Sequence, residues 1–242
     1  DEFLATLAHE MRNPLAPLGN GLQILSRPDL EPATIERVSR IMVRQLGQMV
    51  RLIDDLLDVS RITRGRLELR RARVPLREVL DTAWDAHRGA IEAAGHRFEL
   101  ELPEEPVWLD ADATRLAQVF GNLYSNAAKY TPPGPGSTIR VSARRDGDAV
   151  EVRVADTGIG IPRESLERVF ELFAQVRANR DEHAGGLGIG LSLVRALVRM
   201  HDGTVHAESP GPGRGSTFVV RLPVAPPPAA GAGPPVARAA PP

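Results

Sequence analysis

The chain contains no cysteine, and lysine and aromatic residues are scarce. Without cysteine it has no disulfide bond, no thiolate metal ligand and no cysteine nucleophile, which fits a reducing compartment. No apolar run approaches the roughly 20 residues that a membrane-spanning helix needs. The 30 Lys and Arg nearly balance the 31 Asp and Glu. The resulting net charge of -1 excludes a general electrostatic attraction to nucleic acid or to an anionic membrane.

What the chain does contain is typical of globular domains. Its 242 residues are 42% hydrophobic and 25% charged, which is enough for one large or two small domains. It begins with Asp1 rather than Met, so we expect a piece of a longer protein whose upstream part could hold a sensor or a membrane anchor. Among the 30 basic residues Lys129 is the single lysine, which suggests that its chemistry matters.

Residues 1–66 predict two long helices that pack as a hairpin. In each helix apolar residues recur every seven positions, the spacing of helices packed in a bundle. The first helix has Leu4, Met11, Leu18 and Leu25, and the second has Ile35, Met42, Met49 and Leu56. Residues 26–32, with two prolines, separate the helices. Because two helices cannot bury two apolar seams alone, we expect a homodimer that forms a four-helix bundle.

Residues 74–224 predict a second domain of mixed α/β structure. Apolar residues alternate with polar ones around residues 98–102, 139–143 and 150–154, and Asp146-Gly147 is typical of a hairpin turn. Helices are expected near 111–130 and 188–202, and closing strands at 205–207 and 217–222. The predicted fold is α+β, with a largely antiparallel sheet and helices on one face in a two-layer sandwich.

Residues 225–242 contain seven Pro and seven Ala. This composition predicts a disordered, semi-rigid linker and is typical of a connection to a further domain.

His9 lies on the first predicted helix, away from its apolar seam. With Leu4 at heptad position a, His9 falls at position f, which disfavours a buried core histidine. Glu10 follows directly, and a carboxylate beside an imidazole can accept one ring proton and make the other nitrogen more nucleophilic. Asn13 lies on the same face one turn later, and Pro14 predicts a bend. This bent, exposed segment is therefore a candidate site.

Two polar segments suggest a nucleotide site. On a predicted helix, Asn122, Asn126 and Lys129 lie near one face, where amide oxygens suit Mg²⁺ and an ammonium suits phosphate. Directly after a predicted strand comes Asp156-Thr-Gly-Ile-Gly160, whose carboxylate can accept from an adenine amino group while glycine lets the backbone approach. Taken singly, each segment also fits a polar helix face or an ordinary turn.

Two further segments follow in order. Residues 170–173, Phe-Glu-Leu-Phe, also fit simple core packing. The run Gly186-Leu-Gly188-Ile-Gly190 opens a helix, where exposed N–H groups and the helix dipole favour phosphate.

Together with the His9 segment, these four segments resemble the H, N, G1, F and G2 boxes of the sensor histidine kinases of two-component signalling. The resemblance covers nearly all of residues 1–223. It implies a dimerisation and phosphoacceptor hairpin followed by a Bergerat-type ATP-binding domain, in a cytoplasmic part of a bacterial protein. It also implies autophosphorylation by ATP and relay of the phosphoryl group to a response-regulator receiver domain, with Mg²⁺ as cofactor. The Pro/Ala linker is similar to that of hybrid kinases, which carry a receiver domain downstream.

On the hairpin, the resemblance implies that His9 is the phosphoacceptor and Glu10 its activating base. Asn13 would align water for dephosphorylation of the partner, which implies a phosphatase activity as well. The stretch Gly65-Arg66 after the second helix is the expected hinge between the two domains.

In the second domain the resemblance assigns a role to each polar or glycine position of the boxes. Asn126, with Asn122 as a second candidate, would bind Mg²⁺, and Lys129 would contact phosphates. Tyr130 would flank the adenine and Asp156 would bond its amino group. The glycines would either lie beside the base, at Gly158 and Gly160, or hinge a lid over the phosphates, at Gly186, Gly188 and Gly190.

Other functions are disfavoured by specific absences. The chain has no Gly-Lys-Ser/Thr of a P-loop enzyme and no His-Arg-Asp or Asp-Phe-Gly of a Ser/Thr/Tyr kinase. An ATPase of the gyrase, MutL or heat-shock chaperone kind would lack the hairpin with His9. The alternative that stays open is a dimeric scaffold that binds nucleotide without phosphotransfer. No nucleic-acid partner is expected, nor any membrane contact by this stretch of chain.

Overall fold

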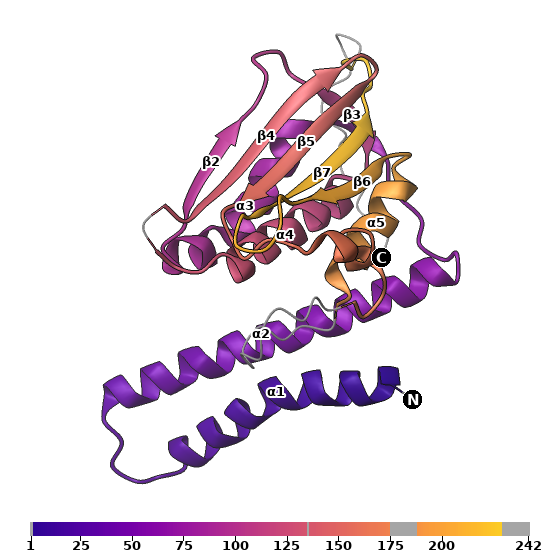
Figure 1. Ribbon diagram of the computed structural model, residues 1–242. Coiled ribbons are helices and arrows are strands. Elements are labelled where there is room, and N and C mark those ends of the chain that lie inside the picture. The colour runs from indigo at the N-terminus through magenta and orange to yellow at the C-terminus, as the bar shows by residue number, and fades with distance from the viewer. Residues whose placement is uncertain (1, 135, 175–187, 229–242) are drawn as a thin grey trace.

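The computed structural model describes residues 2–134, 136–174 and 188–228, which form a helical hairpin and a sheet domain (Figure 1). The hairpin consists of α1 (Glu2–Leu25) and α2 (Pro32–Thr63). The predicted order, a hairpin followed by an α/β domain, is confirmed. Within the described residues, no helix is both long and apolar enough to cross a membrane.

Close packing at one glycine joins the two helices of the hairpin. A Cβ atom on Gly21 would lie 2.7 Å from the Sδ atom of Met42 and 3.3 Å from Val38, so a larger residue here would require the Met42 side chain to move. The helix α1 runs through Pro14 and Pro17 and bends along its length (Figure 1), because a proline lacks an N–H and clashes with the preceding turn.

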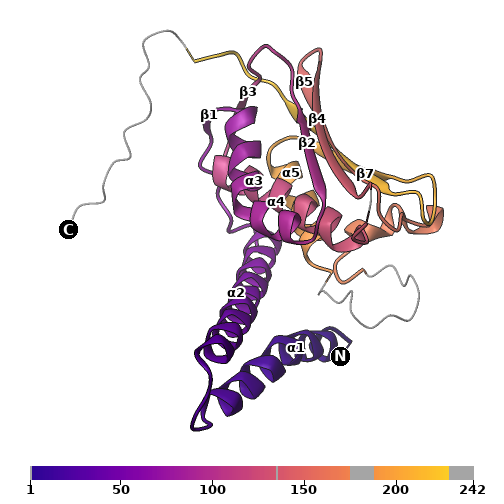
Figure 2. The same ribbon diagram turned by 90° about the vertical axis from the view of Figure 1, so that its left-hand side faces the viewer.

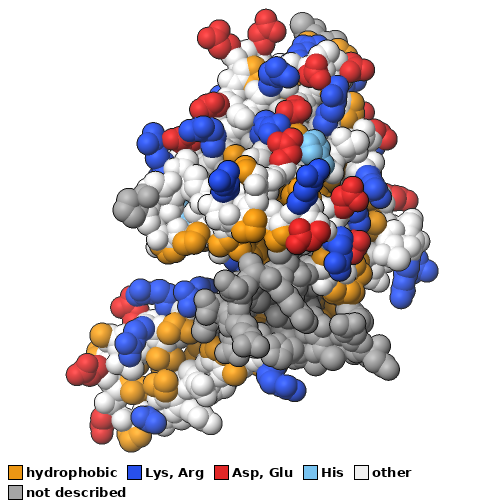
Figure 3. Space-filling model, in the orientation of Figure 1, with side chains coloured by type: hydrophobic (Ala, Val, Ile, Leu, Met, Phe, Trp, Pro, Cys, Tyr) orange, Lys and Arg blue, Asp and Glu red, His pale blue; other side chains and the backbone are white. Residues whose placement is uncertain are grey.

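The helix α2 carries a second apolar seam that the predicted heptads did not include. Its side chains are 44–71% exposed and spaced by three or four residues: Val43, Leu46, Val50, Ile53 and Leu57. Figure 3 shows apolar side chains along the hairpin, below the sheet domain. Ile35 is also 44% exposed, although the heptads placed it in the seam, whereas Val38 is buried. One chain therefore leaves an apolar face of α2 uncovered.

The sheet domain has two layers, as predicted. Its five-stranded sheet has the order β2-β4-β5-β7-β6, in which the β2–β4 pair is parallel and the other pairs are antiparallel. The strands are β2 (Arg97–Glu101), β4 (Thr138–Asp146), β5 (Ala149–Asp156), β6 (Thr204–Glu208) and β7 (Ser216–Pro223). Three helices cover one face (Figure 2): α3 (Leu76–Ala93), α4 (Ala113–Tyr130) and α5 (Gly190–Met200).

The core lies between the helices and the sheet. Along β5 the side chains of Val150, Val152 and Val154 are fully buried, and α4 opposes them with Phe120 and Tyr124. Each such side chain contributes about 1.5–3 kcal/mol through burial. The core therefore holds α4 in place against the strand that precedes the Asp156 segment.

Five elements of this domain were not predicted: one helix, two short strands and two 3-10 turns. The helix α3 follows the short strand β1 (Ala72–Pro75), which pairs antiparallel with β3 (Trp108–Ala111) in a separate two-stranded sheet. Two short 3-10 turns, η1 (Arg163–Ser165) and η2 (Arg168–Phe170), follow β5. The helix predicted over 188–202 is shorter, because it begins at Gly190 and ends at Met200.

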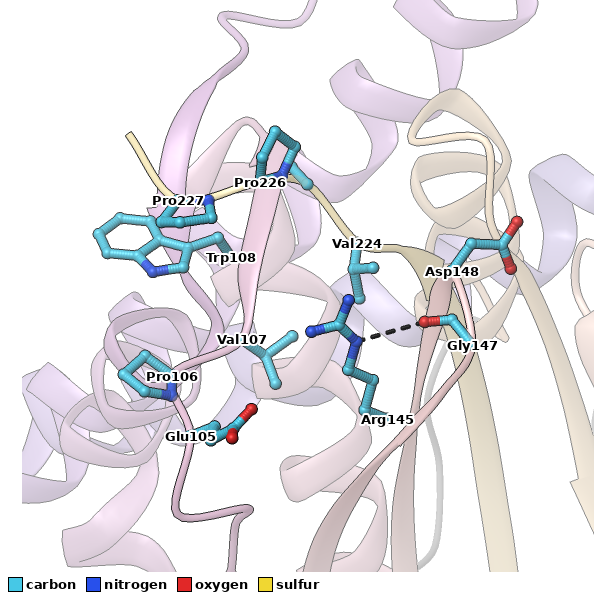
Figure 4. Close-up of a pocket in the computed structure, with 11 residues that line it drawn as sticks. Glu105, Pro106, Val107, Trp108, Arg145, Gly147, Asp148, Val224, Pro226 and Pro227 are labelled. Atoms are coloured by element: carbon cyan, nitrogen blue, oxygen red, sulfur yellow. Dashed lines mark hydrogen bonds between the residues drawn. The ribbon is translucent and has the colours of Figure 1, made fainter. Parts of the chain in front are cut away.

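The last described residues stay attached to the sheet domain. The Val224 N–H donates to Asp148 O at 2.8 Å, and the Ala225 N–H donates to Trp108 O at 2.7 Å. Figure 4 shows Pro227 beside the Trp108 indole, at a cavity of about 820 Å³. The segment that was predicted as a linker is thus hydrogen-bonded to β3 at its first residue, and its remainder from 229 lies outside the described residues.

A polar network ties the end of α2 to α4. Arg115 Nη1 donates to Asp58 Oδ2 at 2.5 Å, and Gln118 Nε2 donates to the same oxygen at 3.0 Å. Gln118 Nε2 also reaches Asp55 Oδ1 at 3.4 Å. Asp58 is only 5% exposed, so its charge requires these partners. After α2 the chain turns at Gly65, whose φ of 64° favours glycine.

A buried histidine joins the ends of two helices in the sheet domain. His201, 2% exposed, follows α5, and its Nε2 accepts from the Asp112 N–H at 3.1 Å. Its Nδ1 lies 2.8 Å from Leu197 O, so the neutral ring carries its proton on Nδ1. Burial lowers the pKa of His201 below its usual value.

This lowered pKa predicts that acid destabilises the domain through His201. The unfolded chain binds the proton more readily, so the stabilisation is complete above the unfolded pKa of about 6.5 and is lost as the pH falls below it. Urea unfolding at neutral pH and near pH 5 would show a larger loss for the wild type than for His201→Asn. The exposed His206→Gln variant should behave as the wild type, and equal losses in all three proteins would contradict the assignment.

The Asp55 carboxyl predicts an opposite pH effect on the contact between α2 and α4. Burial, with smaller contributions from the neighbouring Asp58 and Asp54, raises the pKa of Asp55 to about 6, against the lowering effects of the Gln118 hydrogen bond and Arg51. The ionised form is therefore disfavoured in the contact, and this penalty is relieved as the pH falls below about 6.

Small-angle X-ray scattering can measure this change. We expect the chain to be more extended at neutral pH than near pH 5, and Asp55→Asn to abolish the difference. A pH-dependent radius of gyration that persists in Asp55→Asn would assign the effect to other groups. The matched control is Glu36→Gln, an exposed acidic residue of α2 that does not shift the Asp55 pKa.

Candidate functional site

One cavity gathers the predicted nucleotide segments. It lies where the end of β5 meets the end of α4, and its polar lining comes from Asn126, Tyr130, Asp156 and Ser216. Its apolar walls are Ile159, Ile161, Val169, Leu191 and Phe218, with Ala174 beside them. Apolar walls of this kind suit a flat aromatic base, with a few polar groups to fix its orientation.

Asp156 is the last residue of β5 and the most enclosed charge of this cavity. Its side chain is 9% exposed. Oδ1 accepts from the Gly158 N–H at 2.8 Å and from the Ser216 N–H at 3.2 Å, and Oδ2 accepts from the Ser216 hydroxyl at 2.5 Å. These three donors compensate the buried charge and fix the carboxylate orientation. Because an ionised carboxylate has about four acceptor sites, Asp156 can accept one further N–H.

Two glycines let the backbone pack tightly beside Asp156. A Cβ atom on Gly158 would lie 2.3 Å from Tyr130 O. A Cβ atom on Gly160, whose φ is 69°, would lie 2.2 Å from Gly211 O. The Ile159 N–H donates to Tyr130 O at 3.0 Å. Both glycines therefore allow close packing of backbone on backbone, and the Ile159 hydrogen bond joins the segment after β5 to the end of α4.

The polar residues of α4 lie near one face, as the sequence indicated, but only some of them line the cavity. Asn126 and Tyr130 line the cavity. Asn122 lies toward the first turn of α5, where a Cβ atom added to Gly190 would lie 3.3 Å from the Asn122 Oδ1 atom. Lys129 is exposed, and its Nζ donates to the Tyr130 hydroxyl at 3.1 Å and lies 4.7 Å from that ring centroid. The only lysine therefore lies at the rim of the cavity.

The third glycine segment is only partly described. Gly188, with a φ of 65°, would place a Cβ atom 2.7 Å from Ala174 O, and Gly190 begins α5. Both stand where the chain returns to the cavity through Leu191. Gly186 lies outside the described residues.

The donor set fits a magnesium–nucleotide complex in chemical type. Mg²⁺ takes oxygen ligands and is bound mainly through phosphates and few protein groups. The amide oxygens of Asn126 and Asn122 lie on one helix between the cavity and the start of α5, where phosphates would meet helix N–H groups. In the described ranges no group of three or more His, Cys, Asp or Glu could hold a metal alone.

The His9 segment is remote in sequence and sits on the hairpin. His9 and Glu10 are within α1, and their side chains lie outside the described residues. Asn13, one turn later, is exposed.

Sequence reasoning missed part of the site. Ser216 and Phe218 of β7 contact the cavity from a strand 60 residues after Asp156, and Ile161 and Val169 complete its walls. The register of β5 with β7, which places Ser216 opposite Asp156, brings them there. Alternating apolar residues predicted the strand but not its neighbour.

Comparison with known proteins supports the two-part reading. Residues 1–65 match the family model of the His Kinase A (phospho-acceptor) domain, and residues 111–226 match that of the histidine kinase-, DNA gyrase B- and HSP90-like ATPases. Sensor histidine kinase RcsC of Escherichia coli is 35% identical over 227 residues, covering 92% of this chain and 23% of RcsC. The chain spans about a quarter of the length of such curated relatives.

Solved structures agree with this comparison. Full-length ShkA in complex with AMPPNP matches with a TM-score of 0.65 and 28% identity, over 93% of this chain and 46% of ShkA. Histidine kinase ThkA in complex with response regulator protein TrrA matches with a TM-score of 0.66 and 24% identity, over 92% of this chain and 61% of that one. With both of its modules matched in order, the chain belongs to the sensor histidine kinases of two-component systems.

Proposed function

We propose that the chain autophosphorylates on His9 with ATP and passes the phosphoryl group to an aspartate of a response-regulator receiver domain. The observation that carries this proposal is the enclosed Asp156 carboxylate in an apolar-walled cavity, on a chain whose hairpin bears His9 beside Glu10. The ShkA neighbour binds the ATP analogue AMPPNP, and the ThkA neighbour binds a response regulator, which supports both steps.

In the cavity, the adenine amino group would donate to Asp156, whose remaining acceptor site suits one N–H. The base would lie against Ile161 and Phe218, with Tyr130 flanking it. Lys129 at the rim would contact phosphates, and the N–H groups at the start of α5 would support them. Asn126 and Asn122 would hold Mg²⁺, which neutralises phosphate charge when bound.

The transfer forms a bond between an imidazole nitrogen of His9 and the γ-phosphorus while the bond from that phosphorus to the ADP oxygen breaks. Glu10 would accept the proton of the other ring nitrogen and orient the ring. Because the transition state is loose, catalysis would rest on alignment and on charge neutralisation. His9 and the cavity are on different domains, so the domains would have to rotate about the turn at Gly65. This rotation would open the contact between α2 and α4.

We propose a homodimer formed through the hairpin. The exposed apolar seam of α2 from Val43 to Leu57 is the surface that a second hairpin would cover. A four-helix bundle buries such a seam. The exposed Asn13 would orient water for dephosphorylation of the receiver domain.

The alternative is a dimeric scaffold that binds nucleotide and transfers no phosphate. Incubation with γ-labelled ATP and Mg²⁺ separates the two. We expect an acid-labile, base-stable label on the wild type that His9→Gln abolishes, because a glutamine amide is not a nucleophile for phosphorus. His206→Gln, an exposed histidine in β6, is the matched control and should keep full labelling.

Two results would overturn the kinase assignment. A wild type that binds ATP but takes up no label would favour the scaffold. Label that persists in His9→Gln would show that another residue is the acceptor.

A further inference from the structure

Arginine is concentrated where the hairpin joins the sheet domain. Residues 61–73 contain six arginines and a single acidic residue, Glu68, in a chain whose net charge is -1. The nucleotide site described above uses none of these arginines. The segment connects the last turn of α2 to β1, so its charges lie between the two domains.

Three of these arginines line one cleft. It has a volume of about 640 Å³ and is bordered by Arg61, Arg66 and Arg70, together with the first residues of α4. The Arg66 N–H donates to Arg61 O at 2.8 Å, and the Arg70 N–H donates to Asp112 Oδ2 at 3.0 Å. The backbone of both connecting arginines is therefore fixed to neighbouring elements, and the cleft does not depend on a loose loop.

The guanidinium groups of Arg61, Arg66 and Arg70 have no acid partner within the described residues, whereas two arginines beside them do. Arg71 pairs with Asp202 at 2.8 Å, and Arg115, which also lines the cleft, pairs with Asp58 at 2.5 Å. The salt bridges of the described ranges include none from Arg61, Arg66 or Arg70. Like charges gathered in a concave site repel one another unless an anion lies among them.

Two carboxylates also line the cleft and limit what it can bind. Asp112 already accepts from the N–H groups of Arg70 and Arg115, so its oxygens are committed to the backbone. Glu68 is exposed and lies between Arg66 and Arg70 in the sequence. Ala113 and Thr114, in the first turn of the 18-residue helix α4, face the same cleft and add helix-dipole attraction for an anion.

We infer that this cleft binds a soluble phosphate-containing anion with two or more negative charges, at a site separate from the ATP cavity. Planar guanidinium groups match phosphate oxygens in pairs, and several of them together favour a polyphosphate or a nucleotide phosphate over a monovalent anion. Because Arg61 belongs to α2 and Ala113 to α4, the ligand would bridge the two domains.

Calorimetric titration of the whole chain with inorganic pyrophosphate, in EDTA at physiological ionic strength, tests the site. We expect Arg66→Gln and Arg70→Gln each to weaken binding about tenfold, the value of one charge-assisted hydrogen bond. Glu68→Gln should strengthen it, because a repulsive charge is removed. Arg73→Gln is the matched control: Arg73 is exposed in the same segment but does not line the cleft, so its loss should change binding less than twofold.

A second variant distinguishes anion binding in the cleft from nucleotide binding in the ATP cavity. Asn126→Asp should weaken Mg·ATP and leave pyrophosphate binding in EDTA unchanged, whereas Arg66→Gln should leave ATP affinity unchanged. These readouts do not depend on phosphotransfer. Loss of pyrophosphate binding in Asn126→Asp, equal effects of Arg66→Gln and Arg73→Gln, or no binding to the wild type would each overturn the inference.

A lipid headgroup presents the same phosphate chemistry, so binding to a membrane needs a separate experiment. We expect no sedimentation of the chain with phosphatidylglycerol vesicles, because a concave cleft admits a small anion more readily than a bilayer surface. Sedimentation that Arg66→Gln abolishes would assign the phosphate to a membrane and contradict the soluble ligand.

Discussion

The buried carboxylate of Asp156 is the constraint around which the nucleotide site is built. A charge that is 9% exposed is tolerated only where donors surround it, and the Gly158 N–H and both donor groups of Ser216 meet that need. The Gly158 donor requires a backbone so close to Tyr130 that no side chain fits between them. The Ser216 donors require that β7 pairs with β5 in one register. Sheet order, glycine positions and the orientation of the carboxylate therefore depend on one another.

A second constraint is that the cavity and His9 belong to two different domains. The cavity belongs to the sheet domain, and His9 belongs to the hairpin, so the proposed phosphotransfer would require relative motion of the two domains. In this structure the end of α2 is held on α4 by the buried Asp58 with Arg115 and Gln118. A buried ion pair of this kind costs desolvation, so its net strength is modest, and it can be opened and formed again. The arginine-lined cleft lies beside this contact, where an anion would alter the same balance.

The sequence was sufficient for the fold class, the order of the domains and three of the four polar residues that line the cavity: Asn126, Tyr130 and Asp156. Those features rest on local patterns: seven-residue spacing, strict alternation, and glycines beside polar residues. The helix α3 has the same kind of pattern, because four residues spaced by one turn are buried on one face: Leu76, Val79, Leu80 and Ala83. Its sequence therefore also predicts a helix. Its small partner sheet of β1 and β3 is too short to show a periodicity.

Other features could not be read from local patterns. Ser216 joins the site only through strand pairing, which depends on the whole sheet. The second seam of α2 was hidden because almost every turn of that helix carries apolar residues on more than one face. The contact between Asp58 and Arg115 spans 57 residues and depends on how the hairpin meets the sheet domain.

The central claim, that Asp156 recognises the adenine amino group, is tested most directly by comparing ADP with inosine diphosphate. Inosine carries a carbonyl oxygen in place of the amino group, so the wild type should bind ADP about a hundredfold more tightly, since a charge-assisted hydrogen bond becomes a repulsion. Asp156→Asn presents an amide that can donate to that carbonyl, so the preference should fall below about tenfold. Equal affinity of the wild type for both nucleotides, or an undiminished preference in Asp156→Asn, would contradict this account.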